Sequence, residues 1–334
     1  MIRHLSLILL ITCGISWAAY GQDPIFSQFY ASPLQLNPAF AGNTVGPTVH
    51  LNYRNQWPSW QRAYTTYAAS YSQFFRPVNS GFGLMLLSDD AADGLLKTNK
   101  IAGFYSYRLQ INREWRLKLG VEAAYVQTRL DWDRLVFLDQ LDPLEGLSPG
   151  GTPIPSAEVR PESLNNGYFD VSTGLLVYSS RFYGGVTIKH LNTPNESILG
   201  INENSTSTSL PVRYSVHAGM ELPLNIGPRW SRNSFFSPSI MYVRQEPFAQ
   251  INGGGMLRVG SIFGGLWYRH SIGNADAFIF LVGVQQGALK IGYSFDLPQS
   301  ISLSNTGGTH EISLTMTFGD EDRIDYNDCL NLFR

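Results

Sequence analysis

The sequence predicts an all-β protein: a transmembrane antiparallel β-barrel of the outer-membrane type, with about fourteen strands. Three observations predict it: long runs in which apolar and polar residues alternate, a regular succession of longer and shorter connections between those runs, and an N-terminal export signal. Strands that cross a membrane must close into a barrel, because an open sheet would leave unpaired edges in lipid.

The clearest alternating run spans residues 212–222. One of its faces is apolar: Val212, Tyr214, Val216, Ala218, Met220 and Leu222. The other face is polar or small: Arg213, Ser215, His217, Gly219 and Glu221. Soluble strands are usually about five or six residues long, whereas a tilted membrane strand needs about nine to eleven. The pattern recurs in 116–125, 182–189, 289–296 and 311–318, as lipid outside and polar groups inside would require.

Fourteen candidate strands follow one another along the chain, an even number as in bacterial barrels. We expect them to begin near Val45, Ala63, Ser80, Thr98, Glu114, Tyr168, Arg181, Pro211, Ser234, Phe248, Ser261, Ala277, Gly287 and Thr309. The barrel would then occupy residues 45–318.

The connections between these strands alternate in length. The odd-numbered ones are mostly longer: 55–62, 89–97, 131–167, 191–210, 272–276 and 297–308. The even-numbered ones are mostly tight: 76–79, 110–113, 179–180, 260 and 285–286. The long turn 223–232 and the short loop 245–247 break the rule. Outer-membrane barrels have long external loops and short periplasmic turns, so this parity predicts that both termini are periplasmic.

Residues 1–21 read as a secretory signal peptide, with Arg3 before an apolar core and a small-residue cleavage site that ends at Gly21. A lipoprotein cysteine at Cys13 is the alternative, although Thr12 is bulky for such a site. Cleavage would leave Cys329 as the one cysteine, so no internal disulfide is expected. No later stretch approaches 18 consecutive apolar residues, which excludes a transmembrane helix in the mature chain.

Composition excludes several classes of function. The net charge is −2 and basic residues form no cluster, so nucleic-acid binding is not expected. Charged residues make up only 15% of the chain and aromatic residues 13%. No phosphate-binding loop, HExxH or CxxC motif is present, so we expect no catalytic site, cofactor or metal. Because strands distant in sequence can meet in a barrel, a hydrolase or zinc site among the scattered histidines stays an alternative.

Two segments fall outside the strands. Residues 22–44 are interrupted by proline yet rich in apolar side chains, so they should pack inside the lumen or against the periplasmic rim. Residues 319–334 would form a periplasmic tail, either a handle for a partner or a disordered remnant. The long loops 131–167 and 191–210 are either contact surfaces or mobile solvated loops.

Two groups of side chains have competing interpretations. The lumenal charges should pair across neighbouring strands, with a pore lining as the alternative: Lys118, Glu122, Lys189, Arg213, Glu221 and Lys290. The tryptophans near strand ends should anchor the barrel at the lipid headgroups: Trp57, Trp60, Trp115, Trp230 and Trp267. A sugar-stacking platform at Trp57 and Trp60 is a second reading.

Three stretches carry a family resemblance. They are Asp23-Pro24 with Phe26-Ser27-Gln28-Phe29 and Pro33-Leu34 followed by Leu36-Asn37-Pro38-Ala39-Phe40-Ala41-Gly42, then Asn52-Tyr53-Arg54-Asn55-Gln56-Trp57-Pro58, and finally Leu289-Lys290-Ile291-Gly292-Tyr293-Ser294-Phe295-Asp296 with Gly307-Gly308-Thr309-His310-Glu311-Ile312-Ser313-Leu314. With these motifs the sequence resembles the PorP/SprF family of type IX secretion-associated outer-membrane proteins of the Bacteroidetes. The resemblance runs from Gln22 to about Phe318.

The resemblance implies a non-enzymatic outer-membrane barrel of the type IX secretion and gliding system. Members of the family either associate with periplasmic lipoproteins of the machinery or retain a cognate secreted adhesin at the cell surface. The motif residues implied as partner candidates are Phe26, Gln28, Asn37, Pro38, Ala39, Gly42, Arg54, Gln56, Trp57, Tyr293, Ser294, Asp296, His310 and Glu311. A diffusion pore or small-solute transporter is the alternative function.

Overall fold

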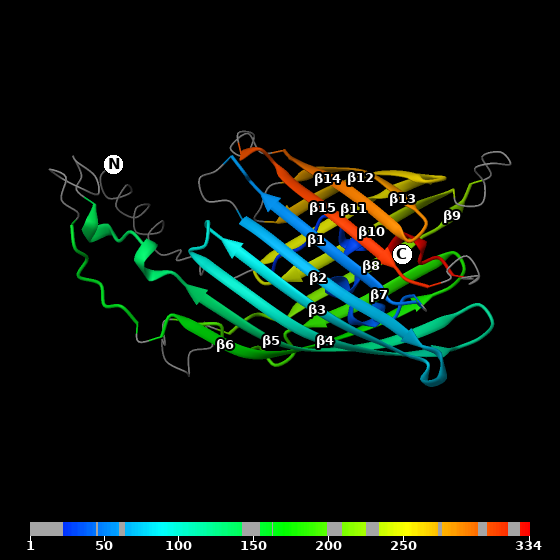
Figure 1. Ribbon diagram of the computed structural model, residues 1–334, viewed down its shortest axis with the longest axis horizontal. Coiled ribbons are helices and arrows are strands. Elements are labelled where there is room, and N and C mark those ends of the chain that lie inside the picture. The colour runs from blue at the N-terminus through cyan, green and yellow to red at the C-terminus, as the bar shows by residue number, and fades with distance from the viewer. Residues whose placement is uncertain are drawn as a thin grey trace, which may run out of the picture.

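The computed structural model describes residues 23–44, 46–59, 64–141, 154–161, 163–198, 209–224, 234–272, 276–299, 306–319 and 328–334. Within these ranges the strands form a single antiparallel barrel, drawn side-on in Figure 1. The expected signal peptide, residues 1–21, lies outside the described residues.

The labelled strands follow the chain in order. They are β1 (Thr48–Gln56), β2 (Tyr64–Phe75), β3 (Ser80–Ala91), β4 (Leu96–Gln110), β5 (Arg116–Leu130), β6 (Asn165–Tyr178), β7 (Phe182–Lys189), β8 (Arg213–Met220), β9 (Leu222–Pro223), β10 (Phe235–Gln245), β11 (Phe248–Val259), β12 (Ile262–Ile272), β13 (Ala277–Gln286), β14 (Leu289–Pro298) and β15 (Thr309–Thr317). Because β8 and β9 both pair with β10, they are two pieces of one barrel strand. Pairing of β1 with β15 closes the wall, so the described strands occupy fourteen positions.

The predicted strands are confirmed, each within three residues of its expected start. One predicted connection is wrong. The expected loop 89–97 is mostly strand, because β3 continues to Ala91 and β4 starts at Leu96. Asp90 stabilises the tight turn between them by accepting a hydrogen bond from the Gly94 backbone N–H. The residues at this rim have polar side chains, which are typical of a loop, but their backbone pairs as strand.

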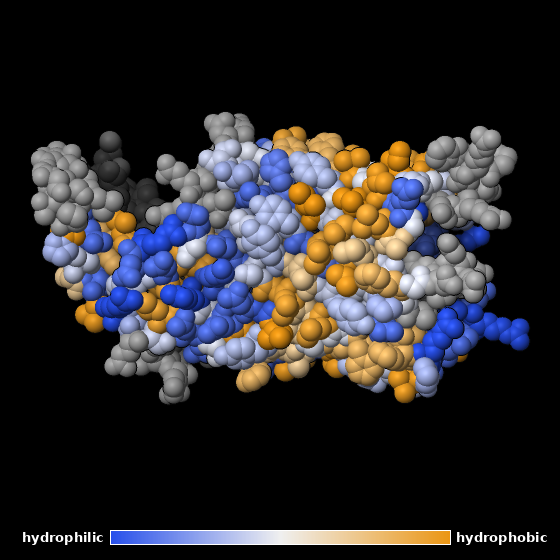
Figure 2. All heavy atoms as spheres, in the orientation of Figure 1, coloured by the Kyte–Doolittle hydropathy of each residue, from blue (hydrophilic) through white to orange (hydrophobic). Residues whose placement is uncertain are grey.

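The two faces of the wall differ as the alternation predicts. Apolar side chains on β8 such as Tyr214 and Val216 are about half exposed on the outside, while the intervening Ser215 and His217 are buried. Figure 2 shows apolar side chains gathered over the centre and right of the barrel, where lipid would contact it. Hydrophilic side chains cover the left part, where the long strand β4 begins and its neighbour β5 ends.

We call the two ends of the barrel the odd end and the even end, after the connections that each carries. The odd end carries the first, third and later odd-numbered connections, including the one between β5 and β6. At this end some strands extend further than their neighbours. β6 has 14 residues but its neighbour β7 only 8, and the two pair only over residues 173–178 of β6.

The chain before β1 runs through the lumen, and we call residues 23–44 the lumenal segment. It contains three short helices, η1 (Phe29–Ala31), α2 (Pro33–Leu36) and η2 (Pro38–Phe40), whose residues are all buried. Its first residue, Asp23, contacts His190 and Arg213 beside the seventh connection, at the odd end. Its last residues lead into β1 at the even end, beside the end of β15.

The expectation that both termini are periplasmic stays a prediction. Because the number of strands is even, the start of β1 lies beside the end of β15, where Thr48 pairs with Thr317. The described chain nevertheless begins at the odd end, because the lumenal segment crosses the barrel before β1 starts. The tail ends at the even end, where the Cys329 backbone N–H donates to Ser179 in the turn after β6.

Residues 328–334, the described part of the tail, also fill the lumen. Cys329, Leu330, Leu332 and Phe333 are buried, and the Phe333 ring lies 4.4 Å from that of Phe40. The structure therefore differs from an exposed handle or a disordered remnant over these residues; the acidic run 320–322 lies outside the described ones. Among the described helices, none is long and apolar enough to span a membrane.

Candidate functional site: the filled lumen and its vestibule

Glu311 on β15 fixes the beginning of the lumenal segment. Its carboxylate accepts hydrogen bonds from the backbone N–H groups of Ser27 and Gln28, at 2.8 and 2.9 Å. The same carboxylate pairs with Arg54 Nε of β1 at 2.9 Å. All these groups are buried, so charge-assisted hydrogen bonds replace the water that the ions lose.

The side chain of Gln28 adds a second layer to this contact. Its amide nitrogen donates to Ser294 Oγ of β14 at 3.0 Å and to the Glu311 main-chain oxygen at 3.1 Å. Its amide oxygen accepts from Ser313 Oγ at 2.6 Å. Beside it, Ser27 Oγ donates to Asp296 at 2.5 Å. Arg269 of β12 pairs with the same Asp296 carboxylate. Ser27, Gln28, Arg54, Arg269, Ser294, Asp296, Glu311 and Ser313 form what we call the Glu311 cluster.

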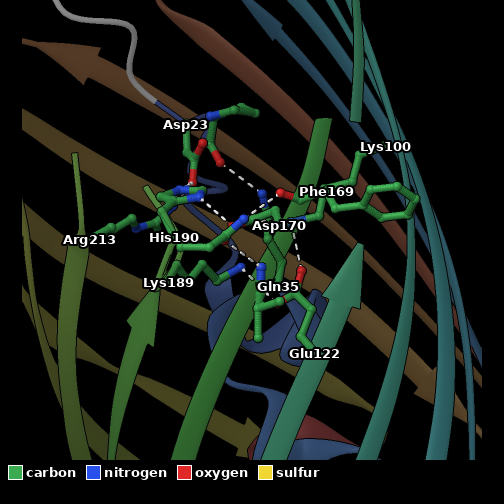
Figure 3. A network of polar contacts seen from close by, with 12 residues as sticks. Asp23, Gln35, Lys100, Glu122, Phe169, Asp170, Lys189, His190 and Arg213 are labelled. Carbon is green, nitrogen blue, oxygen red and sulfur yellow. Dashed lines mark hydrogen bonds and ion pairs between the residues drawn. The ribbon is translucent and has the colours of Figure 1, made fainter. Parts of the chain in front are cut away.

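A second cluster, the Asp23 cluster, continues around the odd end (Figure 3). It consists of Asp23, Lys100, Glu122, Asp170, Lys189, His190 and Arg213. Lys100 Nζ lies 2.6 Å from Glu122 and 3.8 Å from Asp170. His190 Nδ1 lies 3.1 Å from Asp170. Each carboxylate of the cluster thus lies beside positively charged side chains from other parts of the chain.

Asp23 ties the lumenal segment to this cluster. Its carboxylate lies 2.8 Å from His190 Nε2 and 3.2 Å from Arg213 Nη1. Burial alone would raise the pKa of Asp23, but the charges of His190 and Arg213 outweigh it and hold that pKa well below its ordinary value. Burial alone would lower the pKa of His190, but Asp23 and Asp170 outweigh it and raise the pKa to about 9.

These pKa shifts predict that the ion pairs of Asp23 with His190 and Arg213 weaken in alkali. Since His190 has its pKa raised from 6.5 to about 9, its contribution to stability is complete below pH 6.5 and is lost as the pH rises through about 9. The Asp23 contribution is present above pH 3.8 and is lost as the pH falls below it. We expect the midpoint of thermal unfolding in detergent to fall more steeply between neutral pH and pH 9 in the native chain than in His190→Gln. Equal slopes would contradict the assignment.

Three inward-facing glycines make room for the middle of the lumenal segment. A Cβ at Gly120 of β5 would lie 2.2 Å from Ala39 N, and one at Gly174 of β6 would lie 2.0 Å from Asn37 Oδ1. At Gly185 of β7 it would approach Asn37 Nδ2 to 2.9 Å. The wall is therefore bare where the segment passes, which is a common use of glycine within strands.

The side chain of Asn37 exploits this close approach. Its amide nitrogen donates to the main-chain oxygen of Leu175 at 3.0 Å, and its amide oxygen accepts from Ala39 N at 2.9 Å. The second bond caps η2, whose first residue is Pro38. Gly42 has φ +62° and its Cα faces Gly81 of β3, where an added Cβ would be 2.6 Å away. Asn37, Pro38, Ala39 and Gly42 thus share one role, that of fitting the segment to the wall.

The lumenal charges pair less with one another than predicted. Only Glu122 and Lys189 of the predicted set form an ion pair with each other in the described residues, at 3.6 Å. Lys118 Nζ instead donates to the Ala41 main-chain oxygen at 2.7 Å, and Lys290 Nζ to the Leu332 oxygen at 2.9 Å. The prediction of a network across strands was thus wrong for most of the set, because the filling chain offers its own carbonyl groups.

Glu221 and Arg213 also contact the filling segments and not one another. Glu221 accepts a hydrogen bond from Asn331 Nδ2 of the tail at 2.7 Å, and Arg213 pairs with Asp23 of the lumenal segment. Polar residues of the wall therefore hold the chain's own segments. A water-filled pore would leave such groups facing solvent.

The tryptophan at position 267 is a further correction. It is buried in the lumen, its Nε1 donates to Ser239 Oγ at 3.0 Å, and it stacks on Tyr30 at 5.8 Å. It packs against the lumenal segment and does not anchor the barrel in headgroups. Trp57 lies at the odd end, with its backbone N–H bonded to the Gly308 oxygen. Trp60 and Trp230 lie outside the described residues.

A cavity of about 1500 Å³, which we call the vestibule, opens at the odd end above the lumenal segment. Its floor includes Asp23 and Gln35, whose amide donates to the Pro24 oxygen at 2.7 Å. Gln56 and Trp57 line its wall, together with residues of the two long loops. A metal site is not indicated, since the described residues hold no group of three or more His, Cys, Asp and Glu side chains arranged to bind one.

The remaining motif residues lie elsewhere. Phe26 is buried against Ala68 and Leu87, under the vestibule floor. Tyr293 and His310 face outward, joined by a 2.8 Å hydrogen bond from hydroxyl to Nδ1. The structure therefore brings together Gln28, Arg54, Ser294, Asp296 and Glu311, and leaves this outward pair apart from them.

Sequence reasoning missed the Asp23 cluster and Arg269. Asp170 and His190 belong to no motif, and Asp23, which opens the first motif, meets His190 across 167 positions of sequence. A signal did exist for the glycines: Gly120 and Gly185 occupy inward positions of well-defined alternating runs. A missing side chain on a lumenal face indicates that another segment approaches it closely.

Comparison with known proteins decides the family. A model of the family described as type IX secretion system membrane protein PorP/SprF matches residues 18–316. The chain belongs to the PorP/SprF family. The PorP/SprF match spans nearly the whole barrel and the lumenal segment, so the expected resemblance is confirmed. No curated protein matches the chain.

One solved structure supports the fold of this PorP/SprF protein, and a second shows a weaker likeness. The toluene transporter TbuX of Ralstonia pickettii aligns with a TM-score of 0.52 at 11% identity, over 91% of this chain and 96% of that one. A FadL homologue of Pseudomonas aeruginosa aligns at 0.46 and 12% identity, over 85% and 93%. At such identity the likeness to TbuX shows the fold alone. The protein is an outer-membrane β-barrel of a secretion-system family, not of an enzyme family.

Proposed function

We propose that this PorP/SprF protein is a closed barrel that holds partner proteins of the type IX system and does not conduct solutes. The observation that supports the proposal is that the wall's polar groups bond the chain's own segments. Lys118 and Lys290 donate to main-chain oxygens of the lumenal segment and the tail, and Glu311 accepts from the segment's backbone. A conduit would need those groups for its solute or for water.

In this proposal the odd end faces the outside and the even end faces the periplasm, as in barrels with long external loops. The vestibule would then meet a cognate secreted surface protein, an adhesin of the gliding system. Periplasmic lipoproteins of the machinery would contact the even end. The start of β1 and the end of β15 lie there, so a pull on the even end would be transmitted to the lumenal segment that precedes β1.

Deleting the gene tests the proposal. We expect one or a few surface proteins to be lost from the cell surface and to appear in the medium or to fail to be secreted, while outer-membrane permeability to small solutes stays unchanged. Surface proteomics and a dye-uptake assay on the same cells measure both. Intact surface proteins together with reduced solute uptake would instead favour a transporter.

A further inference from the structure

The vestibule holds an unequal set of charges. Every described cation that lines it is already in an ion pair: Arg54, Lys100, Arg160, Lys189, His190 and Arg269. Three described carboxylates that line it form no ion pair: Asp89, Glu158 and Glu196. They come from β3 and from the two long loops. Among the described residues of these walls, the charge that lacks an ion-pair partner is therefore negative.

A buried amide also faces the vestibule without a partner. Gln250 of β11 is 4% exposed and lines the cavity, and its Nε2 has no hydrogen-bond partner among the described residues. An unsatisfied buried donor costs free energy, about 1–3 kcal/mol. A carbonyl group of a bound molecule would satisfy it. This donor and the carboxylates together indicate a ligand that carries both carbonyl groups and positive charge.

The wall beside the vestibule offers a strand edge. β6 pairs with β5 along residues 165–178 but with β7 only along 173–178. Nearer the rim, the Val171 oxygen accepts from Leu191 N at 2.9 Å and the Phe169 oxygen from Asn192 Nδ2 at 2.7 Å. Alternate residues turn their backbone groups to the same side. On that side the N–H of Phe169 and both backbone groups of Gly167 have no partner among the described residues.

This edge favours a polypeptide over a small cation. An extended segment pairs with an unpaired edge by adding a strand. Tyr168, between the two residues with free groups, lines the vestibule, while Phe169 is 72% exposed beside it. The volume of about 1500 Å³ exceeds the roughly 300–1,000 Å³ of small-molecule sites. Trp57 and Tyr64 add aromatic faces that attract ammonium and guanidinium groups.

We propose that the vestibule receives an extended polypeptide segment that carries lysine or arginine side chains and pairs with the free edge of β6. The inference rests on the proposed function, because it identifies the part of a partner protein that this end of the barrel holds. Basic side chains would reach Glu158 and Glu196, and the backbone would meet Gly167 and Phe169.

Fluorescence anisotropy on the purified full chain in detergent tests it. The probe is a short fluorescein-labelled peptide of alternating threonine and lysine. We expect it to bind, to bind more weakly as salt rises, and to lose affinity about tenfold in the double variant Glu158→Gln/Glu196→Gln. Glu114→Gln, an exposed carboxylate at the even end, should leave the affinity unchanged. A peptide with alternate backbone nitrogens methylated should bind less well.

Several results would overturn it. They are equal binding of a threonine–glutamate peptide, equal affinity in the double variant, or competition by spermine with no effect of backbone methylation. The last result would assign a site for small cations. In cells, failure of this inference is distinct from failure of the proposed function. If gene deletion releases a surface protein that the double variant retains, the peptide site is wrong and the holding role stands.

Discussion

A valine in place of Gly120 should displace residues 38–40 from the barrel wall and open the lumen to ions. A Cβ there would lie 2.2 Å from Ala39 N and 2.4 Å from the Pro38 carbonyl carbon, so backbone must move. Because Gly120 is in regular β5, the strand itself accommodates valine, and the strain falls on the lumenal segment. We expect steady current in planar bilayers and a loss of at least about 2 kcal/mol of unfolding free energy.

Gly253→Val is the matched control. A Cβ at Gly253 of β11 has no heavy atom within 4 Å, so the variant should keep the native stability and the native current. Gly120→Ala provides a milder change if the valine variant fails to insert. A Gly120 variant that folds, remains as stable as the native chain and carries no current would contradict the close packing of segment and wall.

Removing the Glu311 carboxylate should be the most destabilising single change in the Glu311 cluster. In Glu311→Ala the N–H groups of Ser27 and Gln28 lose their acceptor, and Arg54 stays buried as an uncompensated charge. Breaking a buried pair by removing one partner costs about 3–5 kcal/mol. Chemical unfolding in detergent, followed by tryptophan fluorescence, measures the loss. Protease cleavage within the lumenal segment should increase in parallel.

Two controls separate charge burial from general damage. The double variant Arg54→Met/Glu311→Leu removes both ions and should be more stable than Glu311→Ala. Arg244→Ala breaks an ion pair whose two side chains are exposed, Arg244 with Glu246 at 2.8 Å, and should cost less than about 1 kcal/mol. Equal losses in all three variants would mean that the Glu311 contacts do not hold the segment.

The wall of the barrel was predictable because the alternation of polar and apolar residues is a local feature of each strand. On β8, successive residues such as Arg213 and Tyr214 fall on opposite faces of one strand, so sequence alone assigns them to lumen or lipid. Trp267 escaped this logic, since both faces of β12 carry large apolar side chains. Its burial against Tyr30 depends on a segment that the strand pattern does not describe.

What fills the barrel was not predictable in the same way. The lumenal segment is non-repetitive, and its contacts join distant positions, as when Ser27 meets Glu311 across 284 positions. The motifs did contain Gln28, Asn37 and Glu311, but a motif does not reveal which residues touch. His190 belongs to no motif, and the motif that contains Asp23 does not reveal its partner, because a single ion pair leaves no periodic trace.

The central claim is that the lumenal segment and the tail close the barrel. Single-channel recording of the purified, unmodified chain in a planar bilayer tests it most directly, beside Gly120→Val from the same preparation. We expect no steady current for the native chain and open-channel steps for the variant. A stable, solute-permeable current through the native chain would contradict it.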